Sequence, residues 1–188
     1  MRKVFKIMRA VISIGIIIVV ALAAIIFLDL AAYTATGLKT LTPTGISSGK
    51  TLVVYDPGLS GAAKGVADKV ASDLQAQGYT VTLAGIKSSA AANTAGYSIV
   101  VAGGPVYAGS ITVSVKDFVD NLSFNSTTKV GVYGSGQGST TPSDVTMIRS
   151  SIPALKDNVS LSNTVVVKIG QSEDLNTRAS DFVNQLTS

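Results

Sequence analysis

The sequence predicts a doubly wound α/β domain, with a five-stranded parallel sheet and helices on both faces, preceded by one transmembrane helix. Three observations predict this fold class. Short runs rich in Val, Ile and Tyr alternate five times with amphipathic segments, as strands and crossover helices do in a parallel sheet. Turns that contain Gly or Pro separate these runs. An uncharged apolar run lies near the N-terminus.

The N-terminal apolar run extends from residue 10 to residue 28, and we predict a transmembrane helix (a signal anchor) over residues 10–32. The run spans about 28 Å at about 1.5 Å per residue, which is close to the thickness of the bilayer core. A basic flank, residues 1–9, precedes it. The segment is therefore expected to contact membrane lipid.

The charges flanking this segment predict its orientation. The positive-inside rule predicts a single-pass membrane protein with a cytoplasmic N-terminus and an extracytoplasmic domain. Three Asn-x-Ser/Thr sequons, at Asn121, Asn125 and Asn158, agree with that orientation. Two alternatives stay open: a cleaved signal peptide that gives a secreted protein, and a domain that remains cytoplasmic.

The elements of the remaining chain follow in order. Residues 33–50 are rich in Gly, Pro, Ser and Thr and predict a flexible linker, so that the domain covers residues 51–188. Apolar runs predict strands over residues 51–55, 79–83, 98–103, 129–134 and 163–170. Amphipathic segments predict helices between the turn at 56–61 and Gly78, over 111–122, over 143–152 with Thr141 or Ser143 as N-cap, and from an N-cap at Ser172 to about Leu186.

The composition excludes several kinds of chemistry. The chain has no Cys and no His, which rules out disulfides, thiol nucleophiles, iron–sulfur clusters, His-dependent triads and the usual zinc sites. We therefore expect no catalytic side chain and no metal site, and any redox chemistry would belong to a bound cofactor. The net charge of +4 arises largely from the basic flank, so we expect no nucleic-acid binding.

The candidate site lies in the loops after the first, third and fourth predicted strands. In a doubly wound sheet, ligands bind beyond the carboxyl ends of the strands, where the strand order reverses. The first loop, YDPGLSGAAKGVA, leads into a helix N-terminus, whose free amide groups favour a phosphate. The second, AGGPVYAGS, combines small residues with one aromatic side chain, Tyr107, a combination suited to a flat ring. The third, YGSGQGST, follows the fourth strand and is another Gly-rich turn.

These loops resemble those of the flavodoxin family over the whole of residues 51–186. The most specific stretch is Gly103–Gly109, which is similar to that family's second flavin loop. The resemblance implies non-covalent binding of flavin mononucleotide (FMN). It places the phosphate on Ser60, Gly61, Ala62, Ala63 and Lys64. It places the isoalloxazine ring beside Gly104, Pro105, Val106, Tyr107, Ala108 and Gly109, with Ser135, Gly136 and Gln137 as the third wall.

Two functions follow from this resemblance. The first is a membrane-anchored protein that binds FMN and transfers electrons to a redox partner of unknown identity, either as an electron carrier or as an FMN-dependent oxidoreductase. The alternative is a flavin-free, membrane-tethered binding or structural module on the same fold. The first loop departs from the family pattern in a way that favours the alternative. Ala62 and Ala63 stand where polar residues are usual, and Ser60 alone supplies a side-chain hydroxyl.

Overall fold

The computed structural model describes residue 9, residues 11–24 and residues 35–188. The chain divides into two compact units, Met1–Tyr33 and Thr34–Ser188. In the first unit residues 11–24 are helical. Residues 1–8 of the basic flank, and residues 10 and 25–32 of the predicted transmembrane helix, lie outside the described residues.

The predicted localisation in the membrane needs correction. Within the part of the chain that the structure describes, no helix combines the length and the apolar character needed to cross a bilayer. A spanning helix needs about 20 apolar residues in succession, and the described helical stretch, residues 11–24, is shorter than that. The single-pass orientation and the contact of residues 10–32 with lipid are therefore not supported.

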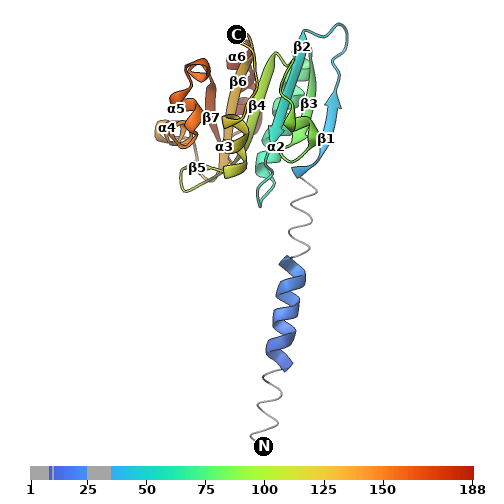
Figure 1. Cartoon of the computed structure of the whole chain (residues 1–188), viewed down its shortest axis with the longest axis vertical. Coiled ribbons are helices and arrows are strands. Elements are labelled where there is room, and N and C mark those ends of the chain that lie inside the picture. Colours follow the sequence, from blue (N-terminus) through green and yellow to red (C-terminus); the bar gives the residue numbers. More distant parts are fainter. Residues whose placement is uncertain (1–8, 10, 25–34) are drawn as a thin grey trace, which may run out of the picture. The chain divides into compact units, whose positions relative to one another are not determined.

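The second unit is built around one mostly parallel sheet with the strand order β1-β3-β2-β4-β6-β7 (Figure 1). All the pairings from β3 through β2, β4 and β6 to β7 are parallel. The short β5 pairs only with β4, in an antiparallel hairpin. The strands are β1 (Leu38–Leu41), β2 (Gly49–Tyr55), β3 (Tyr79–Gly85), β4 (Ile99–Tyr107), β5 (Ser110–Ile111), β6 (Lys129–Gly136) and β7 (Val165–Gly170).

The five predicted strands are all present and are parallel to one another, in the order β3-β2-β4-β6-β7. The prediction of five strands in total is wrong, because β1 and β5 add to them. β1 lies inside the predicted flexible linker, residues 33–50, and runs antiparallel along the edge of β3. The sheet therefore begins well before residue 51, and its β3 edge is covered by the preceding segment of the chain.

Helices cover both faces of the sheet, as predicted for a doubly wound fold. One face packs against α2 and α6, and the other packs against α3, α4 and α5. Two single 3₁₀ turns, η1 and η2, lie in connecting segments. The helices are α2 (Ala62–Ala76), α3 (Val113–Asp120), α4 (Pro142–Ser151), α5 (Pro153–Asp157) and α6 (Leu175–Thr187), and the 3₁₀ turns are η1 (Ser89–Ala92) and η2 (Val159–Leu161).

The helix ends follow local chemistry. Thr141 caps α4 together with Asp144, which confirms one of the two predicted caps. Gly78 follows α2 with φ 93°, the left-handed conformation predicted there. The predicted cap of the last helix is wrong. Asp174, and not Ser172, accepts a hydrogen bond from the Thr177 amide at 2.7 Å, so α6 begins later than the sequence indicated.

Candidate functional site

Three loops meet where the parallel strands β2, β4 and β6 end. β2 is hydrogen-bonded to β3 on one side and to β4 on the other, so the chain changes direction across the sheet between β2 and β4. At this switch point the Asp56 amide donates a hydrogen bond to the Gly103 carbonyl at 2.8 Å. The loop after β2 is thereby joined to β4, at the position where doubly wound sheets bind ligands.

The loop after β2 is shaped by Asp56. One of its carboxylate oxygens accepts a hydrogen bond from the Gly58 amide at 3.0 Å, and the other accepts one from the Ser114 hydroxyl. Asp56 is thus a turn residue that binds a backbone amide two residues further along the chain. Gly58, with φ 61°, packs so tightly on Pro105 that an added Cβ would lie 2.6 Å from the proline ring. The first loop therefore rests directly on the end of β4.

The first turn of α2 offers free backbone amides. Gly61 precedes the helix with φ 71°, and no side chain caps the helix. The Ala62 amide has a long contact of 3.4 Å to the exposed Ser60 hydroxyl. For the amides of Ala63 and Lys64, the described residues provide no acceptor. The partial positive charge of the helix start is thus available to an anion.

Lys64 carries the only side-chain charge of this first turn. Its ammonium lies 2.8 Å from the Asp68 carboxylate and 5.7 Å from the centre of the Tyr55 ring. The hydrogen bond with Asp68 raises the pKa of Lys64, against a smaller lowering by burial. Both partners are substantially exposed, so the ammonium stays accessible, although Asp68 offsets part of its charge.

The loop after β4 is a tight hairpin. β4 continues through Pro105, which lies beside Ser135 of β6, to Tyr107, which pairs with Ser110. The two turn residues, Ala108 and Gly109, both have positive φ, 49° and 79°. This geometry matches the two-residue turns that suit the twist of a hairpin. The predicted loop is therefore strand as far as Tyr107, whose side chain is 51% exposed.

The loop after β6 contributes little side-chain surface. Ser135 and Gly136 are the last residues of β6 and are buried, whereas Gln137 is exposed. Gly109 of the neighbouring hairpin packs on Met147 of α4, whose sulfur would lie 2.8 Å from an added Cβ. The fourteen predicted residues thus lie in the loop before α2 and its first turn, at the ends of β4 and β6, and in the loops that follow these two strands. Their binding of a ligand stays a prediction.

Two groups of residues at this edge escaped the sequence analysis. Buried Tyr133 donates a hydrogen bond from its hydroxyl to the Ala63 carbonyl at 2.9 Å, and so fixes the first turn of α2 from the sheet. Burial raises its pKa well above the ordinary value. Lys168, which is 7% exposed, lies 3.2 Å from Asp144 and donates to the Ser139 carbonyl, which anchors the loop after β6. The roles of Tyr133 and Lys168 depend on contacts between strands and helices that are far apart in the sequence, so no local pattern could indicate them.

The anchoring of this third loop also involves Glu173. Its carboxylate accepts hydrogen bonds from the Thr140 hydroxyl at 2.7 Å and from the Gly170 amide at 2.6 Å. Burial alone would raise the pKa of Glu173, but these hydrogen bonds and the nearby Arg178 bring it below the ordinary value. The loop between β6 and α4 is therefore held in place by a network of charges and hydroxyls.

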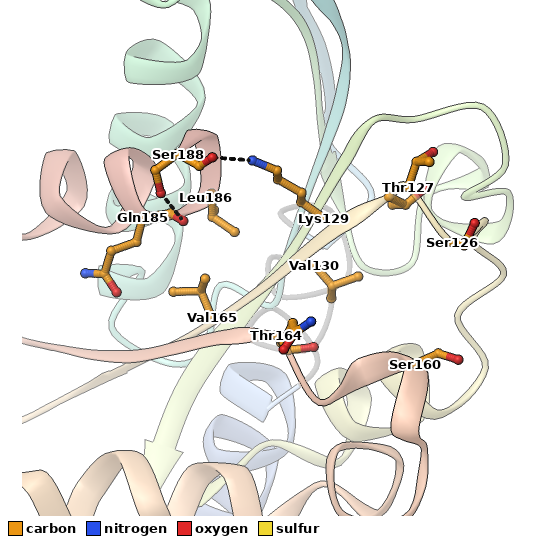
Figure 2. A pocket seen from close by; sticks show the side chains of 12 residues that line it. Ser126, Thr127, Lys129, Val130, Ser160, Thr164, Val165, Gln185, Leu186 and Ser188 are labelled. Atoms are coloured by element: carbon orange, nitrogen blue, oxygen red, sulfur yellow. Dashed lines mark hydrogen bonds between the residues drawn. The ribbon is translucent and has the colours of Figure 1, made fainter.

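The carboxyl edge is closely packed. Three surface pockets stand out among the described residues, and none is lined by any of the fourteen predicted residues. One pocket lies where β6 and β7 begin (Figure 2), and another lies near the start of β2. The third lies beside α5, at the end of α3.

Comparisons with known proteins agree on the fold. Neither the models of known protein families nor the sequences of curated proteins match the chain. Among solved structures, flavodoxin 2 from Bacillus cereus in its oxidised form is similar with a TM-score of 0.53 at 20% identity, over 73% of this chain and 97% of that one. The flavodoxin of Streptococcus pneumonia TIGR4 gives a TM-score of 0.52 at 20% identity, over the same shares of the two chains.

A third similar structure extends the range of organisms. The WrbA-like flavodoxin from Agrobacterium tumefaciens gives a TM-score of 0.51 at 18% identity, over 74% of this chain and 98% of that one. Each match spans almost the whole of the other protein, so the likeness concerns the complete fold and not a shared fragment. At this identity it bears on the fold alone. The second unit of the chain has the flavodoxin-like fold.

Proposed function

We propose that the chain binds FMN without a covalent bond at the carboxyl edge of β2, β4 and β6, and that it transfers electrons through this cofactor. One observation carries the proposal. The uncapped first turn of α2 and the half-exposed Tyr107 lie on the two loops that flank the switch point between β2 and β4. A phosphate acceptor and an aromatic surface are what a flavin nucleotide requires.

The phosphate would lie against Ser60, Gly61, Ala62, Ala63 and Lys64. The amides of Ala63 and Lys64 are free to donate, and the ammonium of Lys64 adds charge. Ala62 and Ala63 lack hydroxyls, and each hydrogen bond to a charged group is worth about 1.5–3 kcal/mol. The loss of two such bonds weakens binding by roughly two to four decades, so we expect only moderate affinity.

The flavin ring would lie beside the β4–β5 hairpin, against Tyr107. The other residues of the hairpin have small side chains or none, which would let the ring approach the backbone; they are Gly104, Pro105, Val106, Ala108 and Gly109. On the side of β6, the ring would be bordered by Ser135, Gly136 and Gln137. The flavin supplies the redox chemistry when it is bound. Because the chain has no His or Cys, we expect no catalytic side chain at the flavin. The protein's own residues would bind and orient the cofactor and exclude water from one face of the ring.

A second candidate is a flavin-free binding or structural module. The packing of the carboxyl edge favours it, since Gly58 rests on Pro105 and Gly109 rests on Met147. Ala62 and Ala63, which lack the hydroxyls that would bind a phosphate, also favour this candidate. The two candidates differ in one measurable property, the affinity for FMN.

The test is a fluorescence titration of FMN with the full-length chain and two variants of Tyr107. The wild type should quench the flavin in a saturable manner. Tyr107→Phe, which retains the ring, should bind as the wild type does, whereas Tyr107→Ala should bind roughly 2–10-fold more weakly, the range expected for one aromatic contact. Equal affinities for all three proteins would contradict the placement of the ring.

A gain-of-function variant separates the two candidates. Ala62→Ser restores a hydroxyl beside the predicted phosphate and should raise the affinity for FMN about tenfold. Ala76→Ser, at the exposed far end of the same helix, is the matched control and should leave the affinity unchanged. If neither the wild type nor Ala62→Ser quenches the flavin at micromolar concentration, the flavin-free module is the better account.

A further inference from the structure

Lys116 of α3 holds a positive charge beside the β4–β5 hairpin. Its ammonium donates a hydrogen bond to the Ser110 hydroxyl at 2.7 Å, and both side chains are half-buried. Ser110 belongs to β5, and Lys116 lies in the helix that follows it. This hydrogen bond therefore ties α3 back onto the hairpin. Neither residue is among the fourteen predicted for the flavin site.

The ammonium lies on the same side of the hairpin as the Tyr107 side chain. Tyr107 and Ser110 are directly opposite each other in the antiparallel pairing of β4 with β5. Two residues in that position direct their side chains to the same face, with Cβ atoms about 4.5–5.5 Å apart. A ring that packs on Tyr107 would therefore lie within roughly 10 Å of the Lys116 ammonium.

No neighbouring carboxylate pairs with this charge. Lys116 takes part in no ion pair within the described part of the chain. The basic residues that do are Lys64, Lys69, Lys168 and Arg178. Asp56, the carboxylate of the first loop, already accepts hydrogen bonds from the Gly58 amide and the Ser114 hydroxyl. The charge of Lys116 is therefore available to act on a ligand at the hairpin.

Such a charge would act differently on the two redox states of a flavin. Reduction of FMN adds two electrons and, at pH 8, one proton, so the ring system gains one negative charge. The phosphate carries the same charge in both states and does not contribute to the difference. At roughly 10 Å, and with screening by water and salt, one cation should favour the reduced ring about three- to tenfold.

We propose that Lys116, held in place by Ser110, raises the affinity of the site for reduced FMN relative to oxidised FMN. This inference rests on the proposed function. By linkage, tighter binding of the reduced form raises the reduction potential of the bound cofactor, and a tenfold preference is equivalent to about 30 mV for a two-electron couple. The bound flavin would thus accept electrons from weaker reductants than it could without this lysine.

The test is the ratio of two dissociation constants, for oxidised FMN and for FMN reduced with excess dithionite. Both are measured by calorimetry on the full-length chain at pH 8 without oxygen; dithionite supplies the two electrons and is oxidised to sulfite. Lys116→Gln keeps a hydrogen-bond donor but removes the charge, and should lower the ratio of the oxidised to the reduced constant about three- to tenfold. Lys116→Arg keeps the charge and should retain the ratio of the wild type.

Two further variants separate position from charge. Ser110→Ala leaves the charge but removes its anchor, so the ratio should fall by less than in Lys116→Gln. Lys156→Gln, at an exposed lysine of α5, is the control and should leave the ratio unchanged. In the flavin-free chain, Lys116→Gln should shift the amide NMR signals of residues 107–111, whereas Lys156→Gln should not.

The possible failures are distinguishable. If oxidised FMN binds and Lys116→Gln has the ratio of the wild type, the role of Lys116 is overturned and the proposed function stands. The same holds if Lys116→Arg lowers the ratio as much as Lys116→Gln does. If the wild type binds neither form of FMN at micromolar concentration, the proposed function is overturned, and this inference with it.

Discussion

Gly103 and Tyr133 lie side by side on β4 and β6, and the contact between them connects the sheet to the candidate site. A side chain at Gly103 would overlap the Tyr133 ring, so only glycine lets the ring lie across the strand. The Tyr133 hydroxyl then reaches the Ala63 carbonyl, and the ring packs edge-on against Phe182, with 6.4 Å between the ring centres. Gly103 thus makes room for the Tyr133 ring, which packs in the core and also holds the first turn of α2.

The substitution Gly103→Ala should destabilise the protein. The added methyl group overpacks the core and displaces the Tyr133 ring, which we expect to cost about 1–3 kcal/mol in the free energy of unfolding, measured by urea denaturation. Gly65→Ala is the control, because Gly65 lies in the interior of α2 with nothing within 4 Å of the added Cβ. It should raise stability by about 0.5–1 kcal/mol. Unchanged stability in Gly103→Ala would mean that the ring does not lie over this glycine.

Among the elements, the loop after β6 is held in place by charged side chains. Glu173 has a lowered pKa in the folded chain, so its hydrogen bonds with Thr140 and Gly170 stabilise the fold while the carboxylate is ionised. That contribution is present above the ordinary Glu value of 4.5, is lost as the pH falls below it, and is gone below the lowered pKa. Acid should therefore loosen this loop.

The acid sensitivity can be measured as the unfolding midpoint in urea between pH 7 and pH 3. Glu173→Gln should be less stable than the wild type at pH 7 and should lose less stability on acidification. Thr140→Val removes a donor to the carboxylate, so the pKa of Glu173 in the folded chain should be lowered less, and the loss of stability on acidification should be smaller than in the wild type and complete at a higher pH. Parallel pH profiles for the wild type and Glu173→Gln would show that the network does not depend on the ionised carboxylate.

Some of the strands could be predicted from the sequence, and others could not. The five parallel strands and their helices follow local patterns of apolar residues, so they could be predicted from the sequence. β1 was missed because its partner, β3, lies about 40 residues later, and the surrounding Gly, Ser and Thr suggested a linker. β4 was predicted too short, because Gly104 and Pro105 are typical of turns, while pairing with β6 keeps them in the strand.

At the scale of the whole molecule, the division of the chain into two units makes a prediction about truncation. Deletion of residues 1–33 removes the first unit alone and should leave the unfolding midpoint of the second unit unchanged. Deletion of residues 1–41 also removes β1 and the hydrogen bonds from the Gly85 and Lys87 amides to Gly37 and Ala35, so the midpoint should fall.

The unfolding midpoints of both truncated chains can be measured by thermal unfolding followed by circular dichroism. The comparison between them isolates the contribution of the edge strand, because the first deletion serves as the control for the second. Equal midpoints for the two truncated chains would mean that β1 adds nothing to the sheet, and that the segment acts as the linker that the sequence suggested.

The sequence could predict that the three candidate loops lie together, but not how they are built. The Gly-rich loops after three strands, placed at one edge by the fold, could be recognised from their residues alone. The hairpin after Tyr107 and the anchoring of the third loop by Lys168 and Glu173 depend on contacts across the sheet. Such contacts leave no local pattern in a sequence.

The binding of FMN at the carboxyl edge is the central claim, and amide NMR of the isotope-labelled full-length chain with and without FMN tests it most directly. We predict saturable shifts at Ser60–Lys64, at Gly104–Gly109 and at Ser135–Gln137, because these residues surround the proposed site. An unchanged spectrum in excess FMN, or shifts confined to the opposite edge at residues 126–130 and 160–165, would contradict the claim and leave a flavodoxin-like fold that serves another purpose.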